Sequence, residues 1–290
     1  MTTTDETYLK IGKAVCDLID GVMTHMVIPP VVVDPELPPV DPEEPEVPEE
    51  PEPEPEIPDP EPPVNVDPNY KLISNDPINY KITTYKADSK GRPIEIFQPE
   101  LATYKDDNYE RSGNIIKVGC PYFGPKTSGS TNSTRHEFRG MTNEFAFDEK
   151  VQFITKYSLD EMDIVGRKVV TQQFHDKEQP IFKRVNRYLG DGIFESYILV
   201  KVADGDGSDA PAIIMGRYKI GEPLVSHVKY DGKAQFIYFE DNNSGIVKSQ
   251  KLNRKGTGGM IYPKYLLYPQ YIKNDEVNSV GKVCRATFYI

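Results

Sequence analysis

Tryptophan is absent from this chain of 290 residues, and cysteine occurs only three times, as Cys16, Cys120 and Cys284. An odd number of cysteines at these wide spacings matches neither a disulfide framework nor the closely spaced ligands of a zinc site. There is no phosphate-binding glycine loop, zincin motif or nucleophile elbow. We therefore expect a protein without a metal, a cofactor or a disulfide scaffold.

Basic residues are missing from residues 29–68, which hold 16 prolines and 14 acidic residues. Proline removes backbone donors and like charges repel, so this segment is expected to be an extended tether without a core. At about 3.1 Å per residue, it spans at most roughly 120 Å. A plain linker and a ligand for a proline-recognition domain are both compatible with this composition.

The overall net charge of −11 conceals a basic region. Residues 69–290 carry 32 basic against 27 acidic residues, a formal charge of +5. A basic surface favours polyanionic partners through long-range steering, and acidic polysaccharide and nucleic acid are two such partners.

Residues 1–28 are expected to contain a short amphipathic helix. Acidic residues precede its apolar part, Lys10 and Lys13 interrupt it, and no small-residue cleavage site follows, so we do not interpret it as a signal peptide. It is also too short and too polar to span a membrane. A helix of this length is marginal in water by itself. We expect it to dock on a second copy or on a larger particle. Its apolar residues at helical spacing are Tyr8, Ile11, Val15, Leu18, Ile19 and Val22.

Residues 69–290 are expected to form one all-β domain. The pair Asp231-Gly232 is a strong hairpin signal, and one helical stretch is expected in residues 158–164. Many short strands separated by turn residues predict a β-sandwich or a β-jelly roll. The apolar or alternating runs cover residues 151–157, 167–175, 195–203, 212–220, 226–240, 245–252 and 282–290.

Three of the segments carry a polar face where a sandwich strand needs none. They are TRHEFRG (134–140), TQQFHD (171–176) and IYPKYLLYPQY (261–271). A solvated outer face explains any one of them, but together they predict one polar surface on a single sheet. Since side chains alternate along a strand, the residues that share these faces are Arg135, Glu137 and Arg139, then Gln173 and His175, then Tyr262, Lys264, Tyr268 and Gln270.

These segments resemble polysaccharide lyase family 7, the alginate lyases, whose motifs are R-(S/T)-E-L-R, Q-(I/V)-H and Y-F-K-A-G-x-Y-x-Q. The order is kept here as RHEFR (135–139), QFH (173–175) and YPKYLLYPQ (262–270). The resemblance covers about residues 75–290 and implies a jelly roll with a substrate groove on one sheet. Tyr265-Leu266 replaces the family's Ala-Gly, and the bulk of Leu266 on the polar face puts groove width and substrate in question.

The residue types suit β-elimination from an acidic polysaccharide. Arg135 and Gln173 are expected to neutralise the uronate carboxylate, so that the proton on C5 can leave. His175 is expected to be the base and Tyr268 the acid that protonates the departing O4. For a uronate of the other C5 configuration, Tyr268 serves as both base and acid. The remaining polar residues are expected to orient the arginines or bind sugar: Glu137, Arg139, Tyr262, Lys264 and Gln270.

Two functions of different classes compete. One is a lyase for alginate, glucuronan or a bacterial capsule, and the other is a non-catalytic carbohydrate-binding jelly roll, such as a virion adhesin. A structural virion protein that binds no sugar would leave the three polar faces unexplained. We expect an acidic polysaccharide as partner, and no nucleic acid or membrane. We also expect carriage on a phage particle through residues 1–28, or release from the cell at lysis.

Overall fold

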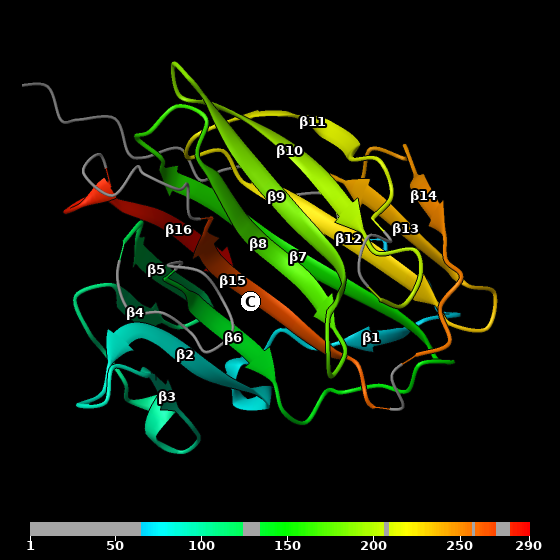
Figure 1. Ribbon diagram of the computed structural model, residues 1–290, viewed down its shortest axis with the longest axis horizontal. Helices are drawn as coiled ribbons and strands as arrows, with labels where there is room; N and C mark the ends of the chain where they lie inside the picture. The colour runs from blue at the N-terminus through cyan, green and yellow to red at the C-terminus, as the bar shows by residue number, and fades with distance from the viewer. Residues whose placement is uncertain (1–64, 124–133, 206–208, 257–258, 271–278) are drawn as a thin grey trace, which may run out of the picture. The chain divides into compact units, whose positions relative to one another are not determined.

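The computed structural model describes residues 65–123, 134–205, 209–256, 259–270 and 279–290 (Figure 1). The predicted helix in residues 1–28 and the tether up to residue 64 lie outside the described residues. Within them the chain forms strands and two short 3-10 helices, η1 (Pro77–Asn79) and η2 (Glu100–Ala102). The strands are β1 (Lys71–Ile73), β2 (Tyr80–Ala87), β3 (Pro93–Ile96), β4 (Tyr109–Ser112), β5 (Ile115–Pro121), β6 (His136–Gly140), β7 (Lys150–Glu161), β8 (Lys168–His175), β9 (Pro180–Gly190), β10 (Ile193–Val200), β11 (Ile213–Lys219), β12 (Leu224–Asp231), β13 (Phe236–Asp241), β14 (Lys248–Lys251), β15 (Tyr262–Pro269) and β16 (Val283–Tyr289).

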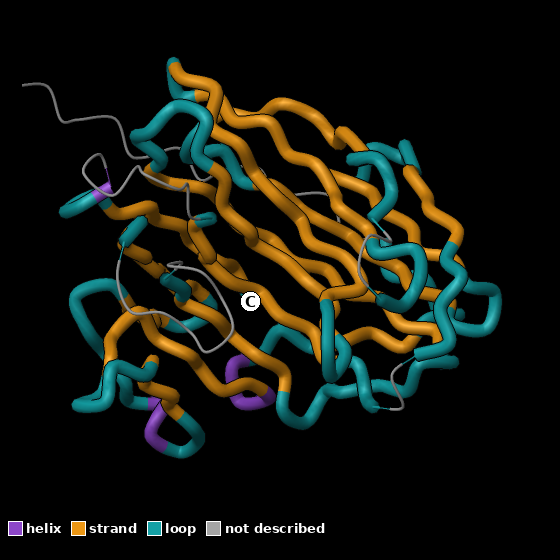
Figure 2. Tube along the Cα trace, in the orientation of Figure 1, coloured by secondary structure: helices purple, strands orange, loops and turns teal. Residues whose placement is uncertain are grey.

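The strands form two sheets that pack face to face (Figures 1 and 2). The front sheet, nearer the viewer in Figure 1, has the strand order β11-β10-β9-β8-β15-β6-β2-β3. The back sheet has the order β14-β13-β12-β7-β16-β5-β4, with β1 paired in parallel to β7. All other pairings between named strands are antiparallel. The predicted all-β jelly-roll sandwich is confirmed.

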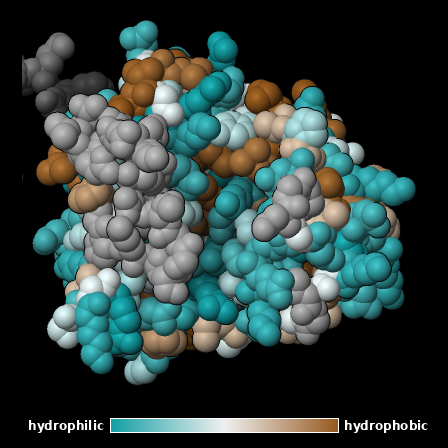
Figure 3. Space-filling view, viewed as in Figure 1, coloured by the Kyte–Doolittle hydropathy of each residue, from teal (hydrophilic) through white to brown (hydrophobic). Residues whose placement is uncertain are grey.

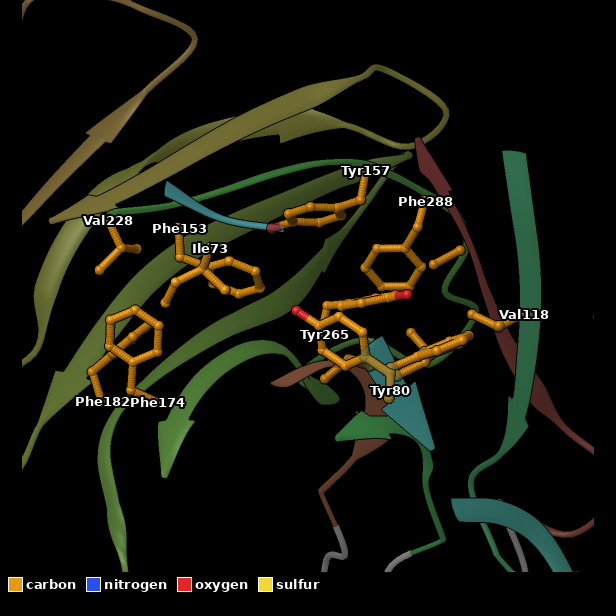
Figure 4. Packing of buried hydrophobic residues seen from close by; sticks show 14 of the residues in the cluster. Ile73, Tyr80, Val118, Phe153, Tyr157, Phe174, Phe182, Val228, Tyr265 and Phe288 are labelled. Carbon is orange, nitrogen blue, oxygen red and sulfur yellow. The ribbon is translucent and has the colours of Figure 1, made fainter. Parts of the chain in front are cut away.

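The inner faces of the two sheets meet in an aromatic core (Figure 4). Phe138 of β6 stacks on Tyr265 of β15 with ring centroids 4.4 Å apart, and Tyr265 contacts Phe288 of the back sheet at 5.2 Å. Phe174 of β8 packs edge-on against Phe182 of β9 at 5.1 Å. Each fully buried side chain of this size contributes about 1.5–3 kcal/mol of hydrophobic stabilisation. Because these residues alternate with the polar ones of β6, β8 and β15, the core forces the polar residues onto the outer face.

The structure confirms the hairpin and corrects the helix. Strands β12 and β13 are joined at Asp231-Gly232, as the dipeptide predicts. The helix expected in residues 158–164 is wrong, because β7 extends as a strand through Glu161. Leu159 is fully buried and pairs with Ala286 of β16. Cross-strand pairing and burial therefore override the local helical preference of this segment. Within the described ranges, no helix is long and apolar enough to cross a membrane.

Candidate active site

The three predicted polar segments are adjacent strands of the front sheet, in the order β8-β15-β6. Lys264 of β15 lies opposite Arg139 on one side and Gln173 on the other. Directly opposed residues share a face, so the polar side chains of all three strands occupy the outer face of this sheet. Figure 3 looks onto this face and shows hydrophilic residues in the hollow at its centre.

Glu137 connects two of the cationic side chains. Its Oε1 lies 2.8 Å from Lys264 Nζ, and its Oε2 lies 3.2 Å from Arg135 Nη1. Glu137 and Lys264 are only 3% and 5% exposed. Burial opposes ionisation of Glu137, but Lys264 and Arg135 outweigh it and hold the pKa of this carboxyl below its ordinary value. Two cations therefore share this carboxylate, and Arg139 adds a third positive charge that acts on Lys264, so the site attracts anions.

His175 is held in one orientation at the end of β8. Its Nδ1 contacts the carbonyl oxygen of Asp176 and lies 3.1 Å from the hydroxyl of Tyr262. The rings of His175 and Tyr262 stack with centroids 5.3 Å apart. Burial, followed by the positive charge of Lys264, lowers the pKa of His175 to about 4. The imidazole is therefore neutral at neutral pH, and a proton on Nδ1 leaves the lone pair of Nε2 available.

Two arginines lie over two of the three tyrosines of β15. The guanidinium carbon of Arg135 is 4.5 Å from the ring centroid of Tyr268, and that of Arg139 is 4.1 Å from that of Tyr262. Burial raises the pKa of Tyr262, which is 8% exposed. Tyr268 is half-buried. These cation–π contacts fix the tyrosine rings and keep positive charge beside the Tyr268 phenol.

The two glutamines differ in their surroundings. Gln173 is 3% exposed, yet its side-chain amide makes no hydrogen bond within the described part of the chain. An amide so placed can still offer donors to a ligand. Gln270 lies just beyond β15, and its Nε2 donates to the carbonyl oxygen of Tyr268 over 3.4 Å.

The site is elongated along the strands. His175 pairs with Tyr262, whereas Tyr268 pairs with Val170, five residues further along β8. At about 3.3 Å per residue, the backbone positions of His175 and Tyr268 lie roughly 17 Å apart. Gln173 and Lys264 lie between them.

Leu266 lies on the polar face, as its position in the strand predicts. It pairs with Glu137 and is completely buried. It packs against Val170, Val185 and Tyr197 in a small apolar cluster that Tyr268 also contacts. One end of the site is therefore apolar, and the phenol of Tyr268 lies at the boundary between the two ends.

A buried ion cluster beside His175 escaped the sequence reasoning. Arg254 Nη2 lies 2.5 Å from Asp176 Oδ2, and its Nε lies 3.2 Å from Asp204 Oδ1. Asp176 also accepts hydrogen bonds from the backbone N–H groups of Glu178 and Gln179, at 2.8 and 2.7 Å. These contacts fix the turn between β8 and β9 and so position the carbonyl oxygen that binds His175. An aspartate directly after the histidine is a turn signal, but the partner arginine is 78 residues away.

A second polar network, also missed, connects the two sheets beneath the site. The buried Arg184 of β9 donates to Ser226 Oγ at 2.8 Å and to Asp241 Oδ1 at 2.7 Å, both on the back sheet. Ser226 Oγ in turn donates to Gln172 Oε1 at 2.7 Å. Since Gln172 precedes Gln173, the back sheet supports the strand that carries Gln173 and His175.

Among the described residues, no group of three or more histidine, cysteine, aspartate or glutamate side chains could hold a metal ion. The two described cysteines, Cys120 and Cys284, are buried and free.

Comparisons with known proteins identify the fold. No family model matches the chain, and no curated protein matches it. Solved structures do match. An alginate lyase from Pseudomonas aeruginosa superposes with a TM-score of 0.62 and 18% identity, covering 73% of this chain and 96% of that one. An alginate lyase from Klebsiella pneumoniae superposes with a TM-score of 0.61 and 18% identity, covering 73% of this chain and 94% of that one. Alginate lyase A1-II′, a member of polysaccharide lyase family 7, superposes with a TM-score of 0.58 and 18% identity, covering 74% of this chain and 93% of that one. The described domain has the fold of these alginate lyases.

Proposed function

We propose that this chain is a polysaccharide lyase that cleaves a uronate-containing acidic polysaccharide by β-elimination. One observation carries the proposal: three polar faces from separate parts of the sequence meet on adjacent strands, with Arg135 and Lys264 paired to one carboxylate and Arg139 opposite Lys264. The fold shared with alginate lyases supports it. A histidine-to-asparagine, tyrosine-to-phenylalanine variant of one such lyase was crystallised with substrate, which supports a search for a His–Tyr pair.

The first requirement is neutralisation of the substrate carboxylate. A proton on C5 becomes more acidic when the adjacent carboxylate is paired, because the developing enolate carries less net charge. The side-chain amide of Gln173 makes no hydrogen bond among the residues that the structure describes, and Arg139 lies one strand beyond Lys264 in the same row. Arg135 is linked to this row by its ion pair with Glu137. Gln173, Arg135 and Arg139 bind the substrate carboxylate. Glu137 holds Arg135 in position.

The elimination then needs a base and an acid. His175 takes the C5 proton on Nε2, the C–H electrons form the C4–C5 double bond, and the C4–O4 bond breaks. Tyr268 gives its phenolic proton to the departing O4, and proton return from His175 and solvent restores both residues. The separation along β8 favours a second route for one C5 configuration, in which Tyr268 acts as both base and acid and His175 stays neutral.

The test is the absorbance of the unsaturated uronate released from polymannuronate, polyguluronate, glucuronan and bacterial capsules. We expect His175→Ala and Tyr268→Phe each to lower the rate by at least about 100-fold on the preferred polymer. Tyr268→Phe keeps the ring beneath Arg135, so the protein stays folded. The control Tyr238→Phe, on β13 of the back sheet, is expected to keep full activity.

The outcomes separate the candidates. Full activity in either variant would remove that residue from the mechanism. Activity that survives His175→Ala but not Tyr268→Phe would select the route with Tyr268 as base and acid. Tight binding without any turnover would favour the non-catalytic carbohydrate-binding protein, an alternative that the bulk of Leu266 supports. Carriage on a phage particle through residues 1–28 stays a separate proposal.

A further inference from the structure

Lys183 extends the polar row of the candidate site by one strand. It lies on β9, opposite Gln173 of β8 on one side and Leu199 of β10 on the other. Opposed residues share a face, so Lys183 belongs to the same outer surface as Lys264 and Gln173. Adjacent strands are about 4.8 Å apart, so Lys183 lies roughly 10 Å from the strand of Lys264, across the strand direction.

A small depression of about 100 Å³ lies beside Lys183 on the surface of β9 and β10. Its two cations differ in their partners. Lys201 Nζ lies 3.5 Å from Asp209 Oδ1 and donates to the carbonyl oxygen of Gly205 over 3.4 Å. Lys183 has no ion pair or hydrogen bond from its amine within the residues that the structure places. The depression is lined by Pro180, Phe182, Lys183, Leu199, Lys201 and Asp209.

The charge on Lys183 is partly buried, and no carboxylate of the described residues forms an ion pair with it. Burial lowers the pKa of Lys183, and the charges of Lys201 and Arg135 lower it further, while Asp209 opposes them. Asp209 is largely exposed, with 63% of its side chain in solvent. A half-buried cation that feels two other positive charges is therefore a position where a bound anion gains electrostatic energy that bulk water does not supply.

We infer that Lys183 anchors a second anion-binding position, which takes the carboxylate of a uronate neighbouring the one that is cleaved. This inference rests on the proposed function and specifies its substrate class. The polymer must carry carboxylates on closely spaced sugars, because one polymer crossing the strands meets the Gln173 row and Lys183 together. A polymer with isolated uronates among neutral sugars leaves Lys183 unpaired.

A purely structural role for Lys183 has few contacts on which it could depend. Lys183 has no described partner that its removal would leave unsatisfied, whereas Glu137 would lose one with Lys264. Replacing Lys183 by methionine keeps the aliphatic stem that packs on the strand and removes only the charge. The loss of an anion contact can therefore be separated from a loss of packing.

The experiment measures binding by calorimetry, with every protein also carrying Tyr268→Phe so that the hexasaccharide is not cleaved during the titration. The probes are the monosaccharide and the hexasaccharide of mannuronate and of guluronate. The proteins are the full chain, Lys183→Met, Lys183→Arg and the control Lys248→Met, on an exposed strand of the back sheet. We expect Lys183→Met to weaken hexasaccharide binding about tenfold, as for loss of one charge-assisted hydrogen bond, and to leave monosaccharide binding unchanged. Lys183→Arg is expected to retain the affinity.

Each result decides the inference. Unchanged hexasaccharide affinity in Lys183→Met overturns it, as does an equal loss in Lys248→Met, which would indicate only general attraction. An equal loss for both sugar lengths places Lys183 at the cleaved sugar instead and also overturns it. A full chain that binds none of the probes overturns it too. If the chain binds the hexasaccharide through Lys183 but cleaves no polymer, the proposed lyase function fails while this inference stands.

Discussion

At the scale of single residues, Lys264 influences both stability and chemistry. Its amine forms a buried ion pair with Glu137 at 2.8 Å, and its charge is the second cause, after burial, of the lowered pKa of His175. Removing one member of a buried ion pair leaves the other charge uncompensated, which costs about 3–5 kcal/mol. Arg135 stays beside Glu137 and reduces that cost. Lys264→Met should therefore lower stability while changing the proton affinity of His175.

This gives a prediction about pH. His175 acts as a base only when neutral, so activity is lost as pH falls through its pKa of about 4. The acid limb of kcat/KM in the full chain is therefore expected well below pH 6.5, the ordinary histidine value. In Lys264→Met the nearby positive charge is gone and Glu137 and Asp176 remain. Both remaining charges raise the pKa of His175, so the limb should move toward higher pH.

The measurement is a pH–rate profile of both proteins, restricted to the range in which each is folded. The control is Lys248→Met, for which the profile should not move. An acid limb at the same pH in Lys264→Met and in the full chain would show that Lys264 does not set the proton affinity of the base. The free energy of unfolding is also expected to decrease as the pH falls. The unfolded chain binds a proton at His175 as pH falls below 6.5 and the folded chain does not, so folding weakens on acidification.

Alternation along a strand was enough to predict which residues of the candidate site share a face. Phe138, Phe174 and Tyr265 are strongly apolar, and they fix the core side of β6, β8 and β15. The polar neighbours then have only one surface left. The partners that hold the site together were not predictable in this way, because Arg254 meets Asp176 only through the tertiary fold.

At the scale of elements, β9 shows why a strand can be missed. Its inward positions include Arg184 and Asn186, where an apolar pattern would signal a strand. The charge of Arg184 is tolerated because Asp241 pairs with it, and Asp241 is 57 residues away on the other sheet. Because the sequence pattern does not reveal β9, it does not place Lys183 opposite Gln173 either. The helix expected in residues 158–164 fails for a related reason, since pairing with β16 decides its conformation.

The turn that joins β8 to β9 carries the second prediction. Asp176 is 1% exposed and binds both the turn's N–H groups and Arg254. Asp176→Asn keeps an oxygen for the N–H groups but removes the charge that faces Arg254. We expect a loss of about 3 kcal/mol in the free energy of unfolding, as for a broken buried ion pair. We also expect a lower kcat with little change in KM, because the carbonyl that holds His175 Nδ1 moves.

Urea unfolding and steady-state kinetics check this, with Glu178→Gln as the matched control on the exposed side of the same turn. The control is expected to change stability by less than about 0.5 kcal/mol. A stable Asp176→Asn variant with an unchanged kcat would mean that the Arg254 cluster neither supports the turn nor positions His175. A rise in KM alone would point to sugar binding instead.

At the scale of the whole molecule, the start of the described domain is fastened to the back sheet. The backbone N–H of Asp67 donates to Gln152 Oε1 at 3.0 Å, and Gln152 Nε2 donates to the carbonyl oxygens of Asp67 and Tyr70 at 2.6 and 2.8 Å. Lys229 Nζ lies 3.0 Å from Asp67 Oδ2. Gln152 is completely buried, so it depends on these partners. Asp67, which lies in the segment that composition predicts as a tether, therefore contacts the back sheet.

Two truncations test this boundary. Removing residues 1–64 leaves every contact of Gln152 in place, so stability and lyase activity are expected to match those of the full chain. Removing residues 1–70 strips the buried Gln152 amide of three hydrogen bonds and Lys229 of its ion pair, while His227 Nε2 stays 3.1 Å from Gln152 Oε1. A buried polar group left without partners costs about 1–3 kcal/mol. The longer truncation should therefore unfold at lower urea concentration, yet keep its KM, because Gln152 and Lys229 lie on the back sheet and the candidate site lies on the front sheet.

Equal stability of the two truncations would show that the Asp67 contacts contribute nothing. A loss of stability already present without residues 1–64 would mean that the domain depends on the segment before it.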